Sequence, residues 1–286
     1  MARKKIDKRD IAIAVLAAIA LTQAFFLFAH KPKVVRPKEK VVISKQVPAK
    51  PAVSVAAREM PQPFQGRIAI IIDDCGYNLQ PCEFSEKIKS PVTFSVLPSL
   101  QHSTDVAECV HKNSKEVMLH LPLEPHHNDD VYPENYLIKT TMSSAKIESI
   151  IHKSLESVPY VDGINNHMGS KATENTKVMT VIFKELQKHD LFFIDSLVTS
   201  NSVCQTVAQS LDLSFGKRDI FLDNENNRPY IEHQFELVAQ EARKKGYAIA
   251  IGHDRRLTLQ IIEEQTDRLE KEGFKIIKVK DLLTHK

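Results

Sequence analysis

The residues of this sequence that are best suited to chemistry follow short apolar runs. Their side chains are carboxylates, imidazoles, amides and hydroxyls, and each group stands at or near the end of one run. Histidines and carboxylates are the ligands of hydrolytic Zn²⁺ sites, which keep one coordination position open for water. The groups therefore fit such a site if the fold brings them together. They are Asp73-Asp74, His120 with Glu124, Asn165-Asn166-His167, Asp195-Ser196 and His253-Asp254.

Each group also has an ordinary structural interpretation when it is considered alone. The pair Asp73-Asp74 suits a turn or a helix N-cap, since aspartate is common at both. His120 lies within an apolar run, as a hydrogen-bonded core histidine would, and His253 lies between glycine and aspartate, as in a turn. Adjacent carboxylates beside a core are costly unless a cation or hydrogen-bond donors compensate them. The joint occurrence of the groups at five run ends favours the chemical interpretation.

Seven apolar runs predict strands, and an eighth run is weaker. Continuous apolar runs of this length are typical of parallel strands that are buried on both faces. The runs are residues 67–72, 92–97, 116–121, 161–165, 191–194, 247–251 and 274–279, with the weaker one at 220–222.

Segments with helical periodicity lie between these runs. Residues 143–157 carry apolar side chains at i, i+3, i+4 and i+8, which places them on one helical face. Gly246 and Gly273 each follow such a segment, where glycine is expected just after a helix C-terminus. The predicted helices are residues 143–157, 177–189, 231–245 and 257–272.

This alternation of strands and helices predicts an α/β fold, either a (β/α) barrel or a doubly wound sheet. In such folds the functional groups gather at the carboxyl ends of the strands, which is where the polar groups stand here. No G-x-G-x-x-G or phosphate-loop motif follows the first run, so nothing in the sequence indicates nucleotide binding.

Six motifs in this order resemble the divergent polysaccharide deacetylase family, a branch of the NodB-like carbohydrate esterases. The resemblance covers residues 66–285 and implies a distorted (β/α) barrel of about seven strands. The motifs are IIIDDCGY (70–77), MLHLPLEP (118–125), GINNHMGS (163–170), FFIDS (192–196), FLDN (221–224) and AIAIGH (248–253).

The resemblance implies roles for the matching residues. Asp73 corresponds to the general base, Asp74 and His120 correspond to metal ligands, and His253 corresponds to the general acid. The metal is then a divalent ion, with Zn²⁺ as the expected identity. The R-x-P motif that is usual in the family is absent, and Asn-Asn-His stands in its region.

The third metal ligand remains a choice between two residues. The family's H-x-x-x-H motif reads H-L-P-L-E here, so Glu124 occupies the place of the second histidine, and His167 is the other candidate. Asp223 is a weaker candidate for the site, because F-L-D-N is also typical of a turn. The residues expected to contact substrate are Asn166, Asp195 and Ser196, of which Asp195 is alternatively expected to orient a histidine.

Two functions are carried forward from the sequence. The leading prediction is a metal-dependent hydrolase that removes an N- or O-acetyl group from a cell-envelope carbohydrate, with an acetylated glycan or glycan fragment as its partner. The alternative is a non-catalytic glycan-binding or envelope-assembly protein on the same fold. The altered second motif and the missing arginine motif favour the alternative, whereas the intact Asp73, Asp74 and His253 favour chemistry.

The N-terminal region predicts attachment to a membrane. Residues 11–29 contain no charged side chain and match the roughly 20 residues that span a bilayer as a helix. Residues 1–10 are basic and predict a cytoplasmic tail, and residues 30–65 are rich in proline and lysine and predict an extended linker. The large Phe28 where a cleavage site needs a small residue favours a retained anchor over a signal peptide. The expected location is the bacterial inner membrane, with the domain 66–286 in the periplasm or otherwise outside the cytoplasm.

The positive net charge belongs to the tail and not to the domain. Residues 1–65 contain 13 Lys/Arg and four Asp/Glu, which leaves 26 basic and 32 acidic residues from Gly66 onward. A domain that binds phosphates should itself carry a basic patch, so the sequence argues against a nucleic-acid partner.

The four cysteines leave their pairing open. No C-x-x-C pair occurs among them, which argues against a structural zinc cluster. Cys75 and Cys82 are close enough in sequence to form a disulfide in an exported domain, and separate buried thiols are the alternative.

Overall fold

The computed structural model of this chain describes residues 63–127 and 132–284. The predicted tail 1–10, the predicted anchor 11–29 and the predicted linker up to residue 62 lie outside the described residues and stay predictions. Within the described part of the chain, no helix has the length and apolar character needed to cross a membrane.

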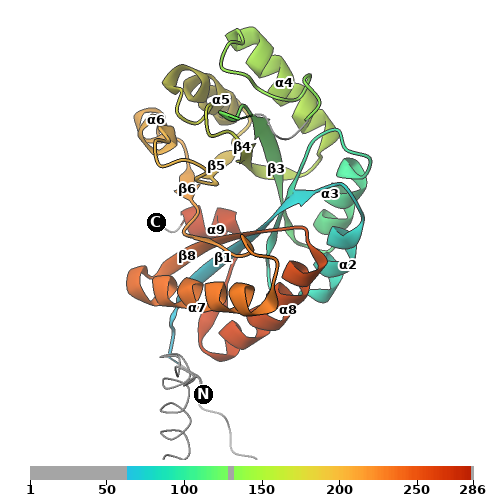
Figure 1. The fold of residues 1–286 in the computed structure, drawn as a ribbon, viewed down its shortest axis with the longest axis vertical. Helices are drawn as coiled ribbons and strands as arrows, with labels where there is room; N and C mark the ends of the chain where they lie inside the picture. The colour runs from blue at the N-terminus through green and yellow to red at the C-terminus, as the bar shows by residue number, and fades with distance from the viewer. Residues whose placement is uncertain (1–62, 128–131, 285–286) are drawn as a thin grey trace, which may run out of the picture. The chain divides into compact units, whose positions relative to one another are not determined.

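All nine described strands form one parallel sheet, coloured from blue to red in Figure 1. Eight strands follow the spatial order β6-β5-β4-β3-β2-β1-β8-β7, and the last strand pairs with the start of the first. The strands are β1 (Gly66–Cys75), β2 (Thr93–Val96), β3 (Glu116–Leu123), β4 (Val161–Met168), β5 (Phe192–Asp195), β6 (Phe215–Lys217), β7 (Ile220–Phe221), β8 (Tyr247–His253) and β9 (Phe274–Ile276).

The sheet is a half-barrel, in agreement with the predicted parallel α/β barrel class. Its edge strands β6 and β7 do not pair with each other in the described part of the chain, so the barrel is open at that seam. The predicted count of about seven strands is low, because β6 reads F-G-K and offers no apolar run. The run 274–279 is also shorter than predicted. It ends as β9 at Ile276, and a helix begins at Val279, where the Glu116 carboxylate accepts hydrogen bonds from the backbone N–H groups of Val279 and Lys280.

All described helices except the C-terminal one cover the outer face of this sheet (Figure 1). The four predicted helices are present, and three of them begin with a side-chain N-cap, from Ser143, Asn175 or Asn227. Four shorter helices of six to ten residues were not predicted, because two or three turns repeat the apolar positions too few times to establish a helical period. The helices are α2 (Gln80–Lys87), α3 (Ser103–Lys112), α4 (Ser144–Ser157), α5 (Thr176–Lys188), α6 (Cys204–Leu211), α7 (Arg228–Lys245), α8 (Arg256–Lys271) and α9 (Val279–Thr284).

The alternation of side chains along each strand divides the core into two layers. In β1, Ile68, Ile70 and Ile72 face the outer helices, and Ala69 and Ile71 belong to a separate inner cluster. Successive side chains of a strand point to opposite faces, so one set of positions fills the barrel interior. Val279 and Leu282 of α9 belong to the same inner cluster, so the C-terminal helix packs inside the half-barrel. At the carboxyl ends of the strands, the inward-facing positions are occupied by polar side chains.

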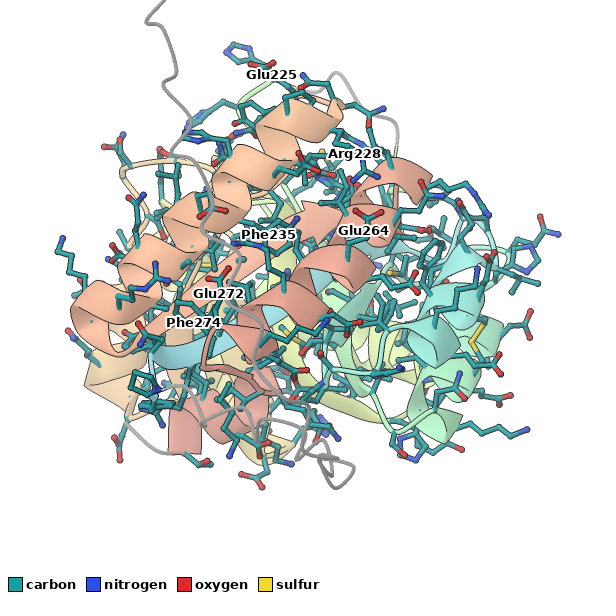
Figure 2. The ribbon with its side chains drawn as sticks, turned by 90° about the horizontal axis from the view of Figure 1, so that it is seen from below. Glu225, Arg228, Phe235, Glu264, Glu272 and Phe274 are labelled. Atoms are coloured by element: carbon teal, nitrogen blue, oxygen red, sulfur yellow. A yellow bond between two sulfur atoms is a disulfide. The ribbon has the colours of Figure 1, made fainter. Side chains whose placement is uncertain are left out.

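The helices α7 and α8 are joined at their surface by a forked ion pair, labelled in Figure 2. Arg228 binds both carboxylate oxygens of Glu264, with N–O distances of 2.6 and 3.1 Å. The buried Phe235 of α7 belongs to the outer core. Because exposed ion pairs contribute little, the apolar contacts of these helices supply most of the stability at this seam.

One disulfide joins Cys82 of α2 to Cys109 of α3. The predicted alternative Cys75–Cys82 is therefore wrong for the pairing. Cys75 belongs to β1 and is buried there, with its thiol directed at the backbone oxygen of Ile72, while the helical path of α2 turns Cys82 towards α3. Cys204 is the second free thiol among the described residues, and it is buried like Cys75. Separate buried thiols were the alternative that the sequence left open.

Candidate metal centre at the strand ends

Two adjacent carboxylates reach the same site at the end of β1. Neighbouring side chains of a regular strand point to opposite faces, so this requires an irregular backbone. The pairing of β1 with β2 shifts register between Ile72 and Cys75, and Asp74 has a positive φ of 62°. A bulge re-aims a side chain, and aspartate is one of the few residues that tolerate the left-handed region. Asp73 and Asp74 therefore both lie near His120, at 3.7 and 3.3 Å from its Nε2.

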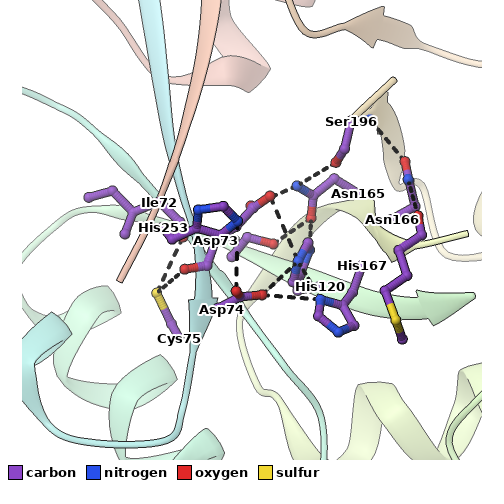
Figure 3. Close-up of polar contacts among 12 residues, drawn as sticks. Ile72, Asp73, Asp74, Cys75, His120, Asn165, Asn166, His167, Ser196 and His253 are labelled. Carbon is purple, nitrogen blue, oxygen red and sulfur yellow. Dashed lines mark hydrogen bonds and ion pairs between the residues drawn. The ribbon is translucent and has the colours of Figure 1, made fainter. Parts of the chain in front are cut away.

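Three potential ligand atoms converge at this point, as Figure 3 shows. The Asp74 Oδ1 atom lies 3.1 Å from His167 Nδ1 and 3.3 Å from His120 Nε2. The two imidazole nitrogens are 3.3 Å apart. The three atoms thus form a nearly equilateral triangle contributed by β1, β3 and β4.

This triangle fits a tetrahedral metal ion. Ligands at about 2.0–2.2 Å from zinc lie roughly 3.3–3.6 Å from one another, close to the separations observed. The Asp74 Oδ1 atom is buried and forms no hydrogen bond, although two imidazole nitrogens are near it. Buried polar atoms are normally satisfied, so an unsatisfied carboxylate oxygen facing two nitrogens fits a cation. Together, one carboxylate and two imidazoles leave one tetrahedral position for water or substrate.

The histidines and carboxylates perturb one another electrostatically. Burial alone raises the pKa of Asp74, but the neighbouring imidazoles of His120 and His167 outweigh it and hold that pKa well below its usual range. Asp73 is fully buried, and burial raises its pKa against the opposing effects of His120 and Asn165. Adjacent carboxylates therefore differ in their proton affinity because they differ in burial and in neighbours.

The Asn165 side chain bridges Asp73 and His120. Its amide nitrogen donates to Asp73 Oδ1 at 2.8 Å, and its amide oxygen lies 2.8 Å from His120 Nδ1. An amide oxygen only accepts, so His120 carries a proton on Nδ1, and its Nε2 atom faces Asp74. The Ser95 hydroxyl donates to the same oxygen at 2.5 Å and fixes the orientation of the amide.

His253 is held by a fully buried carboxylate. Its Nδ1 lies 2.9 Å from Asp223 Oδ1, and its backbone N–H donates to Asp223 Oδ2. Thr258 also donates to Asp223, which leaves this carboxylate fully engaged. The Nε2 atom of His253 faces the site, 3.8 Å from Asp74 Oδ2. Burial lowers the pKa of His253, but Asp223 outweighs burial, and the net pKa is raised.

The sequence model of the divergent polysaccharide deacetylases matches residues 70–283, which is most of the chain. The chain belongs to this family. An uncharacterized protein of Escherichia coli K12, YibQ, is 34% identical over 218 residues, spanning 76% of this chain and 67% of that relative.

Two solved structures agree with the fold of this family member. An uncharacterized protein from Agrobacterium tumefaciens C58 has a TM-score of 0.72 at 19% identity, covering 79% of this chain and 92% of that chain. A T48 deacetylase determined with substrate has a TM-score of 0.50 at 12% identity, covering 77% of this chain and 92% of that chain. At these identities the likeness shows the NodB-like fold alone.

The altered second motif of this deacetylase-family chain does not bring Glu124 to the metal triangle. Its Oε2 accepts hydrogen bonds from the backbone and hydroxyl of Thr140 at 2.6 Å, and its Oε1 lies 2.8 Å from Lys171 Nζ. The strand β3 ends at Leu123, so Glu124 no longer follows the inward alternation that directs His120. Of the two candidates for a third ligand, His167 is the one that the structure places beside Asp74 and His120.

The three residues predicted to contact substrate lie elsewhere around this site and are buried. Both polar groups of the Asn166 side chain bind the backbone. Its amide oxygen accepts from Ser196 N–H, and its amide nitrogen donates to the carbonyl of Met168. Asp195 accepts from Leu197 N–H and from the Ser202 hydroxyl, so it shapes the following loop, and it forms no hydrogen bond with a histidine of the described residues. The Ser196 hydroxyl accepts a longer hydrogen bond of 3.3 Å from Asn165.

Two site residues were missed or weighted too low from the sequence. Asn165 shares the inward face of β4 with His167, and this two-residue spacing was the available signal. Asp223 stands in a segment that is also typical of a turn, and nothing local pairs it with His253 thirty positions away. Only the parallel pairing of β7 and β8 brings the two together.

Proposed function

We propose that this chain is a metal-dependent hydrolase that removes an N- or O-acetyl group from a cell-envelope carbohydrate. The observation that carries the proposal is the triangle of Asp74, His120 and His167 directly beside Asp73 and His253. Membership of a polysaccharide deacetylase family supports an acetylated carbohydrate as the substrate class.

In this proposal Asp74, His120 and His167 hold a divalent metal ion, with Zn²⁺ as the expected identity. A bound ion of this kind polarises the acetyl carbonyl and lowers the pKa of a water molecule. The ligand atoms come from three neighbouring strands and are buried or half-buried. This support fixes their separation before any ion is bound, because the strands are part of the core.

Asp73 is proposed to accept the proton from the attacking water. Asn165 holds its Oδ1 atom, and its Oδ2 atom faces His120 at 3.7 Å. A general base must lie within reach of the proton that it takes, and Asp73 precedes a metal ligand by one residue. Its position is therefore suited to take a proton from a water molecule beside the ligand triangle.

His253 is proposed to protonate the leaving amine or alcohol. Asp223 binds its Nδ1 atom, which directs Nε2 into the site. A histidine oriented in this way delivers its proton from one defined nitrogen. Asp223 acts through His253 and is a positioning residue.

The alternative function, a non-catalytic glycan-binding or envelope-assembly protein, was favoured by the altered motif at Glu124. Asp74, His120 and His167 together offer three ligand atoms without Glu124, which supports the hydrolase proposal over this alternative. The disulfide between Cys82 and Cys109 supports an oxidising compartment such as the periplasm, and residues 11–29 support an inner-membrane anchor.

The proposal is tested on the full-length chain kept in detergent, with elemental analysis of bound metal and measurement of released acetate. The substrates are oligomers of N-acetylglucosamine and an O-acetylated oligosaccharide. We expect Asp74→Ala and His167→Ala to lose one equivalent of metal and the acetate release. Glu124→Gln is the matched control and should keep both, because Glu124 lies outside the triangle.

Metal that stays bound in both alanine variants, or equal loss in the control, would contradict the ligand assignment. A wild-type chain that binds metal but releases acetate from none of the substrates would favour the binding alternative.

A further inference from the structure

A second group of histidines and a carboxylate lies on the outer helices. His152 belongs to α4, Glu185 belongs to α5, and His189 is the C-terminal cap of α5. One ligand atom from each residue lies within 4.8 Å of the other two. None of these residues takes part in the strand-end site, and α4 and α5 pack side by side on the outer face of the sheet.

The carboxylate of Glu185 is the fixed member of this group. Its side chain is 2% exposed, whereas those of His152 and His189 are 54% and 39% exposed. Charged side chains are seldom buried unless they are paired, so the burial of this glutamate needs a compensating charge. Lys188 Nζ lies 2.5 Å from Oε2 and provides one such charge.

The other carboxylate oxygen faces the two imidazoles. His152 Nε2 lies 2.6 Å from Glu185 Oε1, and His189 Nε2 lies 3.4 Å from the same oxygen. The two rings are nearly perpendicular, with centroids 5.4 Å apart, so they do not stack. Both Nε2 atoms are thus directed at one oxygen from two different helices.

An open hollow of about 380 Å³ adjoins these imidazoles. It is lined by His152, Leu155, Glu156 and His189, so both imidazoles border on solvent. A metal ion at this position can therefore complete its coordination with water. An ion enters directly from solvent, and no rearrangement of the core is needed.

We propose that His152, Glu185 and His189 form a second Zn²⁺ site, separate from the strand-end site. Two imidazoles and one carboxylate match the ligand preference of zinc, and they do not match that of Ca²⁺ or Mg²⁺, which favour oxygen ligands. Binding replaces the hydrogen bond between His152 and Glu185, and the Nε2 proton is released to solvent. Lys188 keeps its contact with Oε2, so the carboxylate remains oriented. The bound ion links α4 to the end of α5.

The test is zinc binding to the full-length chain in detergent, followed by equilibrium dialysis and elemental analysis. The wild-type chain should bind two equivalents, and His152→Ala/His189→Ala should bind one. Loss of a group that merely orients a ligand lowers metal affinity about 10- to 100-fold, so the loss of two ligands should abolish this equivalent. Zinc should also raise the melting temperature of the wild-type chain more than that of the double variant, because it binds only the folded site.

His126→Ala is the matched control. His126 pairs with Glu174 at 2.9 Å on the surface, so this variant also removes an imidazole from a carboxylate, but from a pair without a second histidine. It should keep both equivalents. The proposal is overturned if the double variant binds as much zinc as the wild-type chain, or if the control loses as much as the double variant. A wild-type chain whose only equivalent is lost in His152→Ala/His189→Ala would support this site and contradict the strand-end site.

Discussion

The two groups of histidine and carboxylate use the same residue types on different supports. The strand-end group takes its members from β1, β3 and β4, and its imidazoles are buried or nearly so. The outer-helix group takes its members from α4 and the end of α5, and its imidazoles are largely exposed. In the first group Asn165 holds His120 and three neighbouring strands carry the ligands, whereas in the second only Glu185 is fixed by the core.

This difference separates a site suited to catalysis from a site suited to binding alone. Asp73 and His253 stand beside the strand-end triangle and offer proton transfer, and the outer-helix group has no comparable pair among the residues that the structure describes. Catalysis depends on geometry that is fixed before substrate arrives, which strands in a core provide better than exposed helix ends. Substitutions in the two groups should therefore differ in size and in kind.

The largest effect is expected from Asp73→Asn, which removes the proposed general base and keeps the shape of the side chain. Acetate release should fall by about 10²- to 10⁴-fold, the usual contribution of general acid–base catalysis. Metal content should stay at the wild-type value, because Asp73 is not a ligand. The matched control is Asp195→Asn, at the end of a nearby strand, whose carboxylate binds Leu197 N–H and the Ser202 hydroxyl. Equal losses of turnover in the two variants would remove the special role of Asp73.

The next effect concerns the disulfide between α2 and α3. The helix α2 follows β1, which carries Asp74 near its end, so Cys82→Ser/Cys109→Ser should loosen that side of the molecule. The free energy of unfolding, measured with urea, should fall by about 2–4 kcal/mol, as expected for a bridge that closes a loop of 27 residues. A reducing agent should give the same loss in the wild-type chain and none in the variant. If the reductant destabilises both proteins alike, the Cys82–Cys109 bridge is not the cause.

Two adjacent asparagines allow the support of the strand-end group to be tested directly. Asn165→Ala removes the partner of both His120 and Asp73, and zinc affinity should fall about 10- to 100-fold. Asn166→Ala removes bonds to the backbone of Ser196 and Met168, so it should lower stability by about 1–3 kcal/mol and leave zinc affinity unchanged. Competition with a chelator of known affinity measures the first effect, and urea unfolding measures the second. Equal zinc affinities of the Asn165→Ala and Asn166→Ala variants would contradict a supporting role of Asn165 in the strand-end group.

The smallest effect is expected at the outer helices in metal-free protein. His152→Ala should change the free energy of unfolding by no more than about 1 kcal/mol, because the imidazole is largely exposed and Lys188 still pairs with the buried Glu185. His120→Ala should cost more under the same conditions, about 1–3 kcal/mol, since it leaves buried polar partners without their hydrogen bond. Both values follow from urea unfolding in the presence of a chelator. A larger loss for His152→Ala than for His120→Ala would reverse the ranking of the two groups.

The sequence alone determined the class of fold and most of the site. Apolar runs with polar ends follow from the burial of parallel strands, and this pattern is written in consecutive residues. The family motifs, which lie on those same runs, correctly identified the family and named Asp74, His120 and His167 among the candidate ligands. The long amphipathic helices were predicted for the same reason, because their apolar stripe repeats within a few turns.

Only the tertiary structure decided which candidates meet. The choice between Glu124 and His167 depends on where β3 ends and on the register between β3 and β4. The roles of Asn165 and Asp223, the pairing of Cys82 with Cys109, and the group at His152, Glu185 and His189 all depend on contacts between elements far apart in the chain. Local periodicity fixes the face on which a side chain stands. Long-range packing fixes what that face meets, and no short stretch of sequence contains this information.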